Sequence, residues 1–232
     1  MTWIEGPLVG FDLETTGVNP CSDLPVQVAL VRCERDGSVD RKVFIVDPGR
    51  DIPAGAQAIH GISTERAQRE GCSLKQAAEI THRVLEESQA DQVPVVAMNA
   101  SFDITIAATL FRHFGLAPFP WVALVDPLVI DRRLDPYRPG KRRLDDLCKF
   151  YGVECGGFHD AGNDADATLE LTRAIAQRYP EIAEHDIGDL TKLQADWHRI
   201  WAVGYDSWCR DQGRLGLGKD EFCWPVREVP AQ

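Results

Sequence analysis

The chain has 232 residues, 44% of them hydrophobic and 26% charged, which is long enough for one large domain with an extension. Its 25 basic and 36 acidic residues give a net charge of −11, which argues against a broad electrostatic surface for a polyanion. No apolar run approaches the roughly 20 residues that span a bilayer, and the opening MTWIEGP lacks the pattern of a signal peptide. We therefore expect a cytoplasmic protein with no membrane partner.

The first informative stretch is VGFDLETTG at Val9–Gly17, a short apolar run closed by turn formers. Successive side chains of a strand point to opposite faces, so Asp12 and Glu14 would project from one face, with their Cα atoms roughly 7 Å apart. Burying two unpaired anions would cost several kcal/mol, so a positive partner must compensate. For this stretch alone, a pair of acids solvated at a strand end remains the alternative.

The segments that follow predict alternating strands and helices. Val26–Cys33 and Val39–Val46 flank a turn and predict an antiparallel hairpin. Ser73 and Gln76 have the spacing of a capping box that opens a helix. The remaining predicted elements are strands at Val93–Met98 and Trp121–Val125 and helices at Ser101–Phe114, Leu144–Tyr151 and Asn163–Arg178. This order predicts an α/β fold with a mixed five-stranded sheet flanked by helices.

Two further acids lie near the starts of predicted helices, on the sides that would face a core. Asp103 shares a helical stripe with Leu110. Asp164 shares a stripe with Leu171 in the same way. For either acid alone, a carboxylate favoured by the dipole of a helix start is an alternative that stays open.

Asp166 aligns instead with the polar side of its helix and is predicted to be exposed. Asp12, Glu14, Asp103 and Asp164 then make four inward-facing acids near strand or helix ends. Because Mg²⁺ and Mn²⁺ prefer carboxylate oxygens, this set is what a pair of such ions would need.

Three segments, FDLETTG, NASFD and HDAGND, resemble in order the three motifs of the DEDDh branch of DnaQ-like 3′–5′ exonucleases, the family that includes the proofreading ε subunit of bacterial DNA polymerase III. The similarity extends to AQAIHGIS at residues 56–63 and to LDDLCKFYGVE before the third motif. Three motifs in this order form a specific signal. The resemblance implies a ribonuclease H-like fold, with an exonuclease domain at residues 1–184 and a C-terminal helix and tail at 185–232.

The resemblance also implies roles for single residues. The four acids Asp12, Glu14, Asp103 and Asp164 would bind two Mg²⁺ or Mn²⁺ ions. His159 would act as the general base, since a histidine with a pKa near 6.5 can accept a proton from water at neutral pH.

The family resemblance further implies a pocket for the 3′-terminal nucleotide. Its lining would be Thr15, Thr16, Gly17, Ile59, His60 and Gly61. Asn99 and Phe102 would hold the second motif and the region of the scissile phosphate, although a helix-capping asparagine and a core phenylalanine are equally consistent with the sequence.

The predicted function is hydrolysis of phosphodiester bonds at 3′ ends of single-stranded DNA by two metal ions, with release of nucleoside monophosphates. One alternative is an RNA exonuclease of the same family, such as an oligoribonuclease-like enzyme, because no residue that reads a 2′-hydroxyl is evident. The other is a noncatalytic module that docks nucleic acid, a DNA polymerase or another replication or repair protein. Four clustered carboxylates argue against that module.

Two features lie outside this scheme. Residues 132–143, RRLDPYRPGKRR, carry six basic residues and one acid, and either a solvated loop or a lip that contacts phosphate would explain them. Residues 187–210 predict a helix with Leu190, Trp197 and Trp208 near one stripe. We expect that stripe to pack onto the domain rather than to dock a partner, with an extended tail after it.

Overall fold

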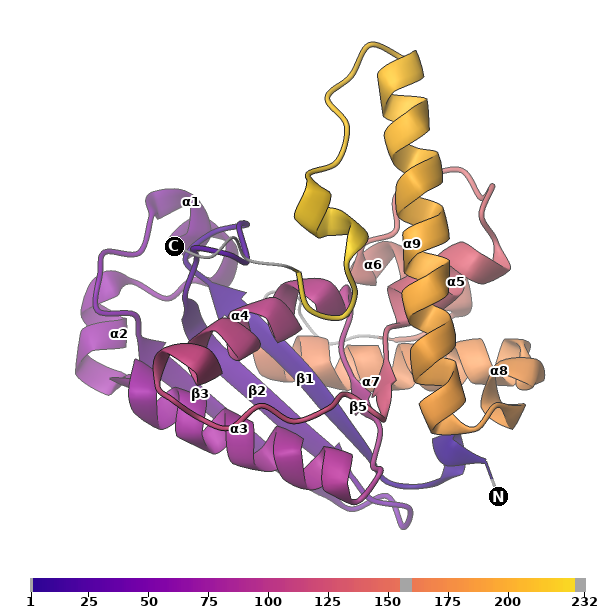
Figure 1. Cartoon of the computed structure of the whole chain (residues 1–232). Coiled ribbons are helices and arrows are strands. Elements are labelled where there is room, and N and C mark those ends of the chain that lie inside the picture. The colour runs from indigo at the N-terminus through magenta and orange to yellow at the C-terminus, as the bar shows by residue number, and fades with distance from the viewer. Residues whose placement is uncertain (1, 155–159, 228–232) are drawn as a thin grey trace.

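The computed structural model describes residues 2–154 and 160–227, which form a mixed six-stranded sheet with helices on both faces (Figure 1). The order of the strands across the sheet is β4-β3-β2-β1-β5-β6. These strands are β1 (Leu8–Thr15), β2 (Pro25–Cys33), β3 (Val39–Asp47), β4 (Cys72–Ser73), β5 (Val95–Val96) and β6 (Leu124–Val125). The first three pair antiparallel, and β5 and β6 continue the sheet in parallel beyond β1.

The predicted fold class is confirmed, with one strand more than the five expected. The additional strand, β4, has only two residues and pairs in parallel with β3. The strands predicted at 93–98 and 121–125 also shorten to two residues each in β5 and β6. Short parallel strands leave few residues for an alternating pattern, so the sequence marks their place better than their ends.

The helices are α1 (Ala54–His60), α2 (Thr64–Glu70), α3 (Leu74–Ala90), α4 (Ala100–His113), α5 (Pro127–Leu134), α6 (Leu144–Tyr151), α7 (Ala161–Arg178), α8 (Pro180–Glu184) and α9 (Ile187–Asp211). The capping box predicted for α3 is present. The Ser73 hydroxyl accepts from the backbone N–H of Gln76 at 3.3 Å, and the side-chain oxygen Oε1 of Gln76 accepts from the backbone N–H of Ser73 at 3.1 Å. The bounds of α6 are those predicted, whereas α7 begins two residues earlier than expected.

The alternation of β1 separates two cores. Val9, Phe11 and Leu13 pack with α3 and α4 on one face of the sheet. The residues between them face α7 on the other side of the sheet, and Gly10 determines how closely that helix approaches. A Cβ on Gly10 would lie 2.9 Å from the carbonyl oxygen of Ala165, so the absent side chain lets α7 lie directly against β1.

Helix α9 covers the free edge of the sheet at β6. The Gln194 side chain donates to the Leu124 carbonyl at 2.8 Å and accepts from the Asp126 N–H at 2.6 Å. The Thr191 hydroxyl accepts from the Leu124 N–H at 3.0 Å. These side chains satisfy backbone groups that another strand would otherwise pair, so the first half of α9 is an integral part of the fold.

The prediction for the C-terminal part is right for the first half of α9 and wrong for the second. Leu190 is fully buried, but Ile200 is 68% exposed and Trp208 is 45% exposed. The segment after α9 is not an extended tail, because it turns back along α9 (Figure 1, yellow) and buries Trp224 in the core with α4. No helix within the described ranges is long and apolar enough to cross a membrane.

Candidate active site

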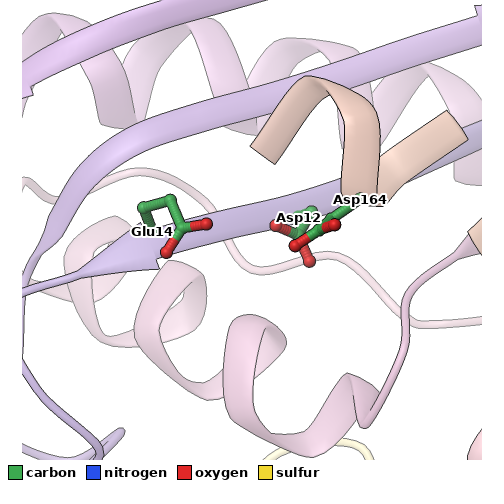
Figure 2. A group of neighbouring side chains, drawn as sticks. All are labelled: Asp12, Glu14 and Asp164. Atoms are coloured by element: carbon green, nitrogen blue, oxygen red, sulfur yellow. The ribbon is translucent and has the colours of Figure 1, made fainter. Parts of the chain in front are cut away.

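Three carboxylates meet where β1 passes the first turn of α7. Asp12 and Glu14 come from the face of β1 toward α7, and Asp164 comes from the first turn of that helix (Figure 2). One oxygen from each of the three side chains lies within 4.8 Å of the others. The expected alternation along β1 and the stripe predicted for Asp164 are therefore both seen, and together they create this cluster.

The electrostatics at Asp12 and Glu14 are dominated by burial and by neighbouring acids. Burial raises the pKa of Asp12 well above its usual range, and the neighbouring Asp103 and Asp164 charges raise it further. Burial also raises the pKa of Glu14 to about 7, again with help from Asp164 and from Asp160. The charged groups that act most strongly on both carboxyls are thus other acids. A divalent cation fits this set of oxygen donors, because it would supply the missing positive charge.

Asp103 lies beside the cluster rather than within it. It is only 4% exposed, as its helical stripe predicts, and among the charged neighbours its carboxylate has the largest effect on the pKa of Asp12. Burial raises the pKa of Asp103 well above its usual range, although the Leu13 N–H and its own backbone N–H oppose that change. The structure therefore gathers three of the four predicted metal ligands closely and places the fourth next to them.

A buried acid that the sequence analysis did not select fixes the start of α4. The carboxylate of Asp126, 1% exposed, accepts from the backbone N–H groups of Asn99 at 3.1 Å and Ala100 at 2.9 Å. It also accepts from Leu128 at 3.0 Å, at the start of α5. The pair Asp126-Pro127 is a recognisable signal for the start of α5, but nothing local in the sequence reveals its bond to α4.

Asn99 does not cap α4, so the capping alternative is wrong. Its backbone is left-handed, with φ 58° and ψ 48°, and its side chain makes no capping hydrogen bond. Phe102 is half-buried and packs with the core on the α4 side of the sheet, as the alternative of a core residue predicts. Both residues flank the turn that leads into Asp103.

The start of α7 is held by two residues that the sequence analysis also missed. Asp160 caps the helix by accepting from Gly162 at 3.1 Å and Asn163 at 3.2 Å. Gln27 of β2 donates to Asp160 at 3.2 Å and accepts from the Ala161 N–H at 3.0 Å. The predicted general base, His159, precedes Asp160 in the sequence and lies outside the described residues.

The residues predicted to hold the terminal nucleotide come from two segments that the fold brings together. His60, at the end of α1, has its pKa lowered by burial, while the backbone of Thr15 at the end of β1 acts in the opposite direction. Ile59 beside it is 57% exposed. Gly61 ends α1 with a left-handed φ of 74°, a conformation that glycine adopts freely.

The loop after β1 is fixed by internal bonds. The Thr16 hydroxyl donates to Asp23 at 2.8 Å and accepts from Arg50 at 2.7 Å. A Cβ on Gly17 would lie 2.5 Å from the same carboxylate, so a larger residue there would displace the Asp23 side chain. The Thr15 hydroxyl donates to the Gly17 carbonyl at 2.7 Å. This part of the loop therefore offers a rigid backbone, with its hydroxyl groups already bonded.

Comparison with known proteins assigns the chain to a family. A family model described as an exonuclease, RNase_T, matches residues 9–172. The chain belongs to this exonuclease family. The matched region spans the three motifs, so the predicted resemblance to DnaQ-like exonucleases is confirmed at the level of the family.

Among its relatives are PolC-type DNA polymerases III. The chain is 27% identical over 193 residues to that of Caldanaerobacter subterraneus subsp. tengcongensis and 29% identical over 202 residues to that of Halalkalibacterium halodurans. These matches cover 82% and 84% of this chain but 13% of each polymerase.

Escherichia coli exonuclease I in complex with a dT13 oligonucleotide is similar in structure, with a TM-score of 0.64 and 25% identity over 76% of this chain and 42% of that protein. The chain thus corresponds to less than half of exonuclease I and to a small part of the polymerases. The ribonuclease H-like fold is shared with the matching part of exonuclease I.

Proposed function

We propose that this chain is a metal-dependent 3′–5′ exonuclease that removes nucleoside monophosphates from single-stranded DNA. The observation that carries this proposal is the cluster of Asp12, Glu14 and Asp164, whose oxygens lie within 4.8 Å of one another and in which neighbouring acids raise the pKa values of Asp12 and Glu14. Membership of an exonuclease family supports the reaction. DNA is favoured over RNA because the similar proteins include DNA polymerases and an exonuclease bound to a dT13 oligonucleotide.

The four acids would together coordinate two Mg²⁺ or Mn²⁺ ions. The charges of Asp103, Asp164 and Glu14 all raise the pKa of Asp12, which suits Asp12 as a ligand shared by both ions, and Asp103 adds a fourth carboxylate beside the cluster. When bound, such ions activate water and stabilise the charge that develops on the leaving oxygen. We assign His159 the role of general base, which accepts the proton of the attacking water.

The terminal nucleotide would lie between the end of α1 and the loop after β1. The exposed side chain of Ile59 offers an apolar surface to the base, and His60 beside Thr15 fixes the relative position of the two segments. The rigid backbone from Thr15 to Gly17 would line the sugar and phosphate. By analogy with the PolC-type relatives, we also propose a DNA polymerase or another replication or repair protein as a partner.

Purified protein tests the proposal on DNA and RNA oligonucleotides of one sequence, labelled at the 5′ end, with Mg²⁺, Mn²⁺ or EDTA. We expect single-stranded DNA to shorten in steps of one nucleotide from its 3′ end, only with metal. Faster shortening of RNA would establish the RNA exonuclease instead. Binding without any cleavage, in either metal, would leave the noncatalytic docking module as the answer.

A further inference from the structure

The two sequence features that the active site does not use meet in one groove of about 840 Å³. One wall is α5 with the start of the basic stretch 132–143, and the other is the exposed second half of α9 (Figure 1). We call this the Arg–Trp groove. Its principal lining side chains are Arg132, Arg133, Tyr137, Ile200, Tyr205 and Trp208.

The α9 wall of the groove is a ladder of aromatic rings. Trp201 and Tyr205 stack with centroids 5.2 Å apart and an angle of 14°, and Tyr205 and Trp208 follow at 5.8 Å and 29°. The guanidinium of Arg132 lies 3.5 Å from the centroid of the Trp201 ring and extends the stack. Tyr205 is 40% exposed, and Tyr137 on the opposite wall is 93% exposed. Large aromatic surface is therefore open to water on both walls.

The groove is also a positively charged site on an acidic protein. Three arginines and no acid are among the described residues that line it, whereas the whole chain has a net charge of −11. Arg138 is paired with the buried Asp131 at 2.7 Å. Arg133 is exposed beside Trp197 and forms no ion pair among the described residues. Arg132 lies against Trp201 and is partly buried, so its pKa is lowered by burial, while the charges of Asp126 and Asp131 act in the opposite direction. The acidic surface of the rest of the protein would repel a polyanion, whereas the groove would attract it.

We infer that the Arg–Trp groove binds single-stranded nucleic acid, with bases against its aromatic rings and phosphates against Arg132 and Arg133. The inference rests on the proposed function, because a strand with its 3′ end at the carboxylates must continue along the protein. Helix α5, which carries both arginines, begins at Asp126, the same residue that caps α4 near Asp103. Its eight residues span about 12 Å, so the groove begins one short helix away from the active site.

A peptide is the other class of occupant, and the lining favours nucleic acid over it. Ile200 is the single aliphatic side chain, apart from a proline, among the described residues of the lining. An amphipathic peptide would find few partners there for leucine or isoleucine side chains. Flat rings and arginine planes instead match the flat faces of bases.

The experiment measures binding of labelled five- and thirty-nucleotide oligothymidylates by fluorescence anisotropy, in EDTA so that no hydrolysis occurs. The variants are Arg133→Glu, Tyr137→Ala and Trp208→Ala, and Arg112→Glu, on an exposed residue in the last turn of α4, is the charge-matched control. We expect each groove variant to bind the long oligonucleotide about 5- to 100-fold more weakly than wild type does. The affinity for the short oligonucleotide should change little in these variants, and Arg112→Glu should bind both oligonucleotides nearly as wild type does. Arg133→Glu should also lower the slope of log K against log salt by about 1.

Unchanged affinity for the long oligonucleotide in all three groove variants, with melting temperatures near wild type, would overturn the inference. So would binding of a labelled acidic peptide that Arg133→Glu abolishes while oligonucleotide binding persists, since the groove would then dock a protein. Hydrolysis of the short oligonucleotide with Mn²⁺ is measured separately. Its absence in wild type refutes the proposed function, whereas the binding data judge the groove alone.

Discussion

The surroundings of two groups of acids differ: Asp131 is fully buried, whereas the cluster of Asp12, Glu14 and Asp164 is half-buried beside the buried Asp103. Asp131 in α5 is 0% exposed, and the chain neutralises it with Arg138 at 2.7 Å, with Arg142, and with the Tyr151 hydroxyl, which donates at 2.9 Å. The two carboxylates of β1, Asp12 and Glu14, instead have other acids as their strongest charged neighbours. An acid neutralised by arginines of its own chain stabilises the structure, whereas acids gathered beside one another favour the binding of a cation.

The comparison also explains two of the six basic residues in the stretch 132–143. Arg138 and Arg142 fold inward onto Asp131 and are 10% and 13% exposed at their side chains, so they are neither solvated nor free to meet phosphate. Burial raises the pKa of Tyr151, and the Asp131 charge raises it further, which keeps the Tyr151 hydroxyl protonated as a donor. The two alternatives given by the sequence, solvation or contact with phosphate, therefore apply to the other four basic residues, which include Arg132 and Arg133 at the end of α5.

Removal of a proposed metal ligand should have the largest effect. Asp12→Asn and Asp103→Asn each replace a carboxylate by an amide of nearly the same volume, so we expect activity to fall by about 10³-fold or more. Turnover of single-stranded DNA with Mn²⁺ measures this, and circular dichroism reports whether the fold is kept.

Asp166→Ala is the matched control on the same helix. Asp166 pairs with Arg41 at 2.9 Å at the surface, and such pairs contribute little. We expect activity within about twofold of wild type. If Asp166→Ala inactivates the protein and Asp164→Ala does not, the third motif has been assigned to the wrong acid.

His159→Ala tests the residue of the third motif that lies outside the described ranges. Loss of a general base should slow turnover by about 10²- to 10⁴-fold and leave substrate binding nearly unchanged. Single-turnover rates across pH 5 to 8 measure this, and the wild-type dependence on a group with a pKa near 6.5 should disappear. An unaltered rate would assign the base to another group.

Asp131→Asn tests the neutralised acid. The change leaves Arg138 and Arg142 partly buried without a carboxylate, and breaking a buried pair in this way costs about 3–5 kcal/mol of the free energy of unfolding. Urea unfolding measures the loss, and activity per folded molecule should stay near wild type. Normal stability combined with lost activity would show that Asp131 belongs with the active site.

The sequence predicts the acids of the site better than it predicts what holds them. Periodicity places Asp164 on the inner side of α7 and Asp166 on the outer side, because a helix that packs on a sheet repeats every 3.6 residues. No local sequence pattern reveals that Gly10 lets α7 approach β1. Nor does one reveal that the Asp126 carboxylate accepts hydrogen bonds from the first turns of both α4 and α5. Those contacts join residues far apart in the sequence, so they become visible only in the fold.

The second half of α9 shows the same limit in a wrong prediction. Its aromatic stripe is typical of a buried helix face, and the first half of the helix is buried as expected. Beyond Ala202 the helix extends past the sheet, where Tyr205 and Trp208 face the groove instead of a core. A periodic apolar stripe predicts that a helix face makes contacts, but it does not specify whether the protein core or a bound molecule makes them.

Metal should stabilise the folded protein, and this effect separates the two kinds of buried acid. A ligand that binds only the native state adds about 2.7 kcal/mol at a hundred times its Kd, so Mn²⁺ should raise the melting temperature of wild type. Asp12→Asn should blunt that rise, and in EDTA it should be more stable than wild type because one repelling charge is gone. Asp131→Asn should retain the full rise. Differential scanning fluorimetry across a Mn²⁺ titration measures all three proteins, and a wild type without any rise would remove the basis for a metal site.

The smallest expected effect is a pH dependence whose sign the metal reverses. The pKa of Glu14 is raised from 4.5 to about 7, so the native state binds a proton more tightly than the unfolded chain does. The stability that this proton contributes is present in full below about pH 4.5 and is lost as pH rises through about 7. In EDTA, wild type should therefore lose stability relative to Glu14→Gln between pH 5 and 8. With saturating Mn²⁺ the metal competes with protons for the same oxygens, so wild type should instead gain stability over that range. Melting curves of both proteins at several pH values, in each condition, measure the difference. The same trend with and without Mn²⁺ would show that Glu14 does not contribute to metal binding.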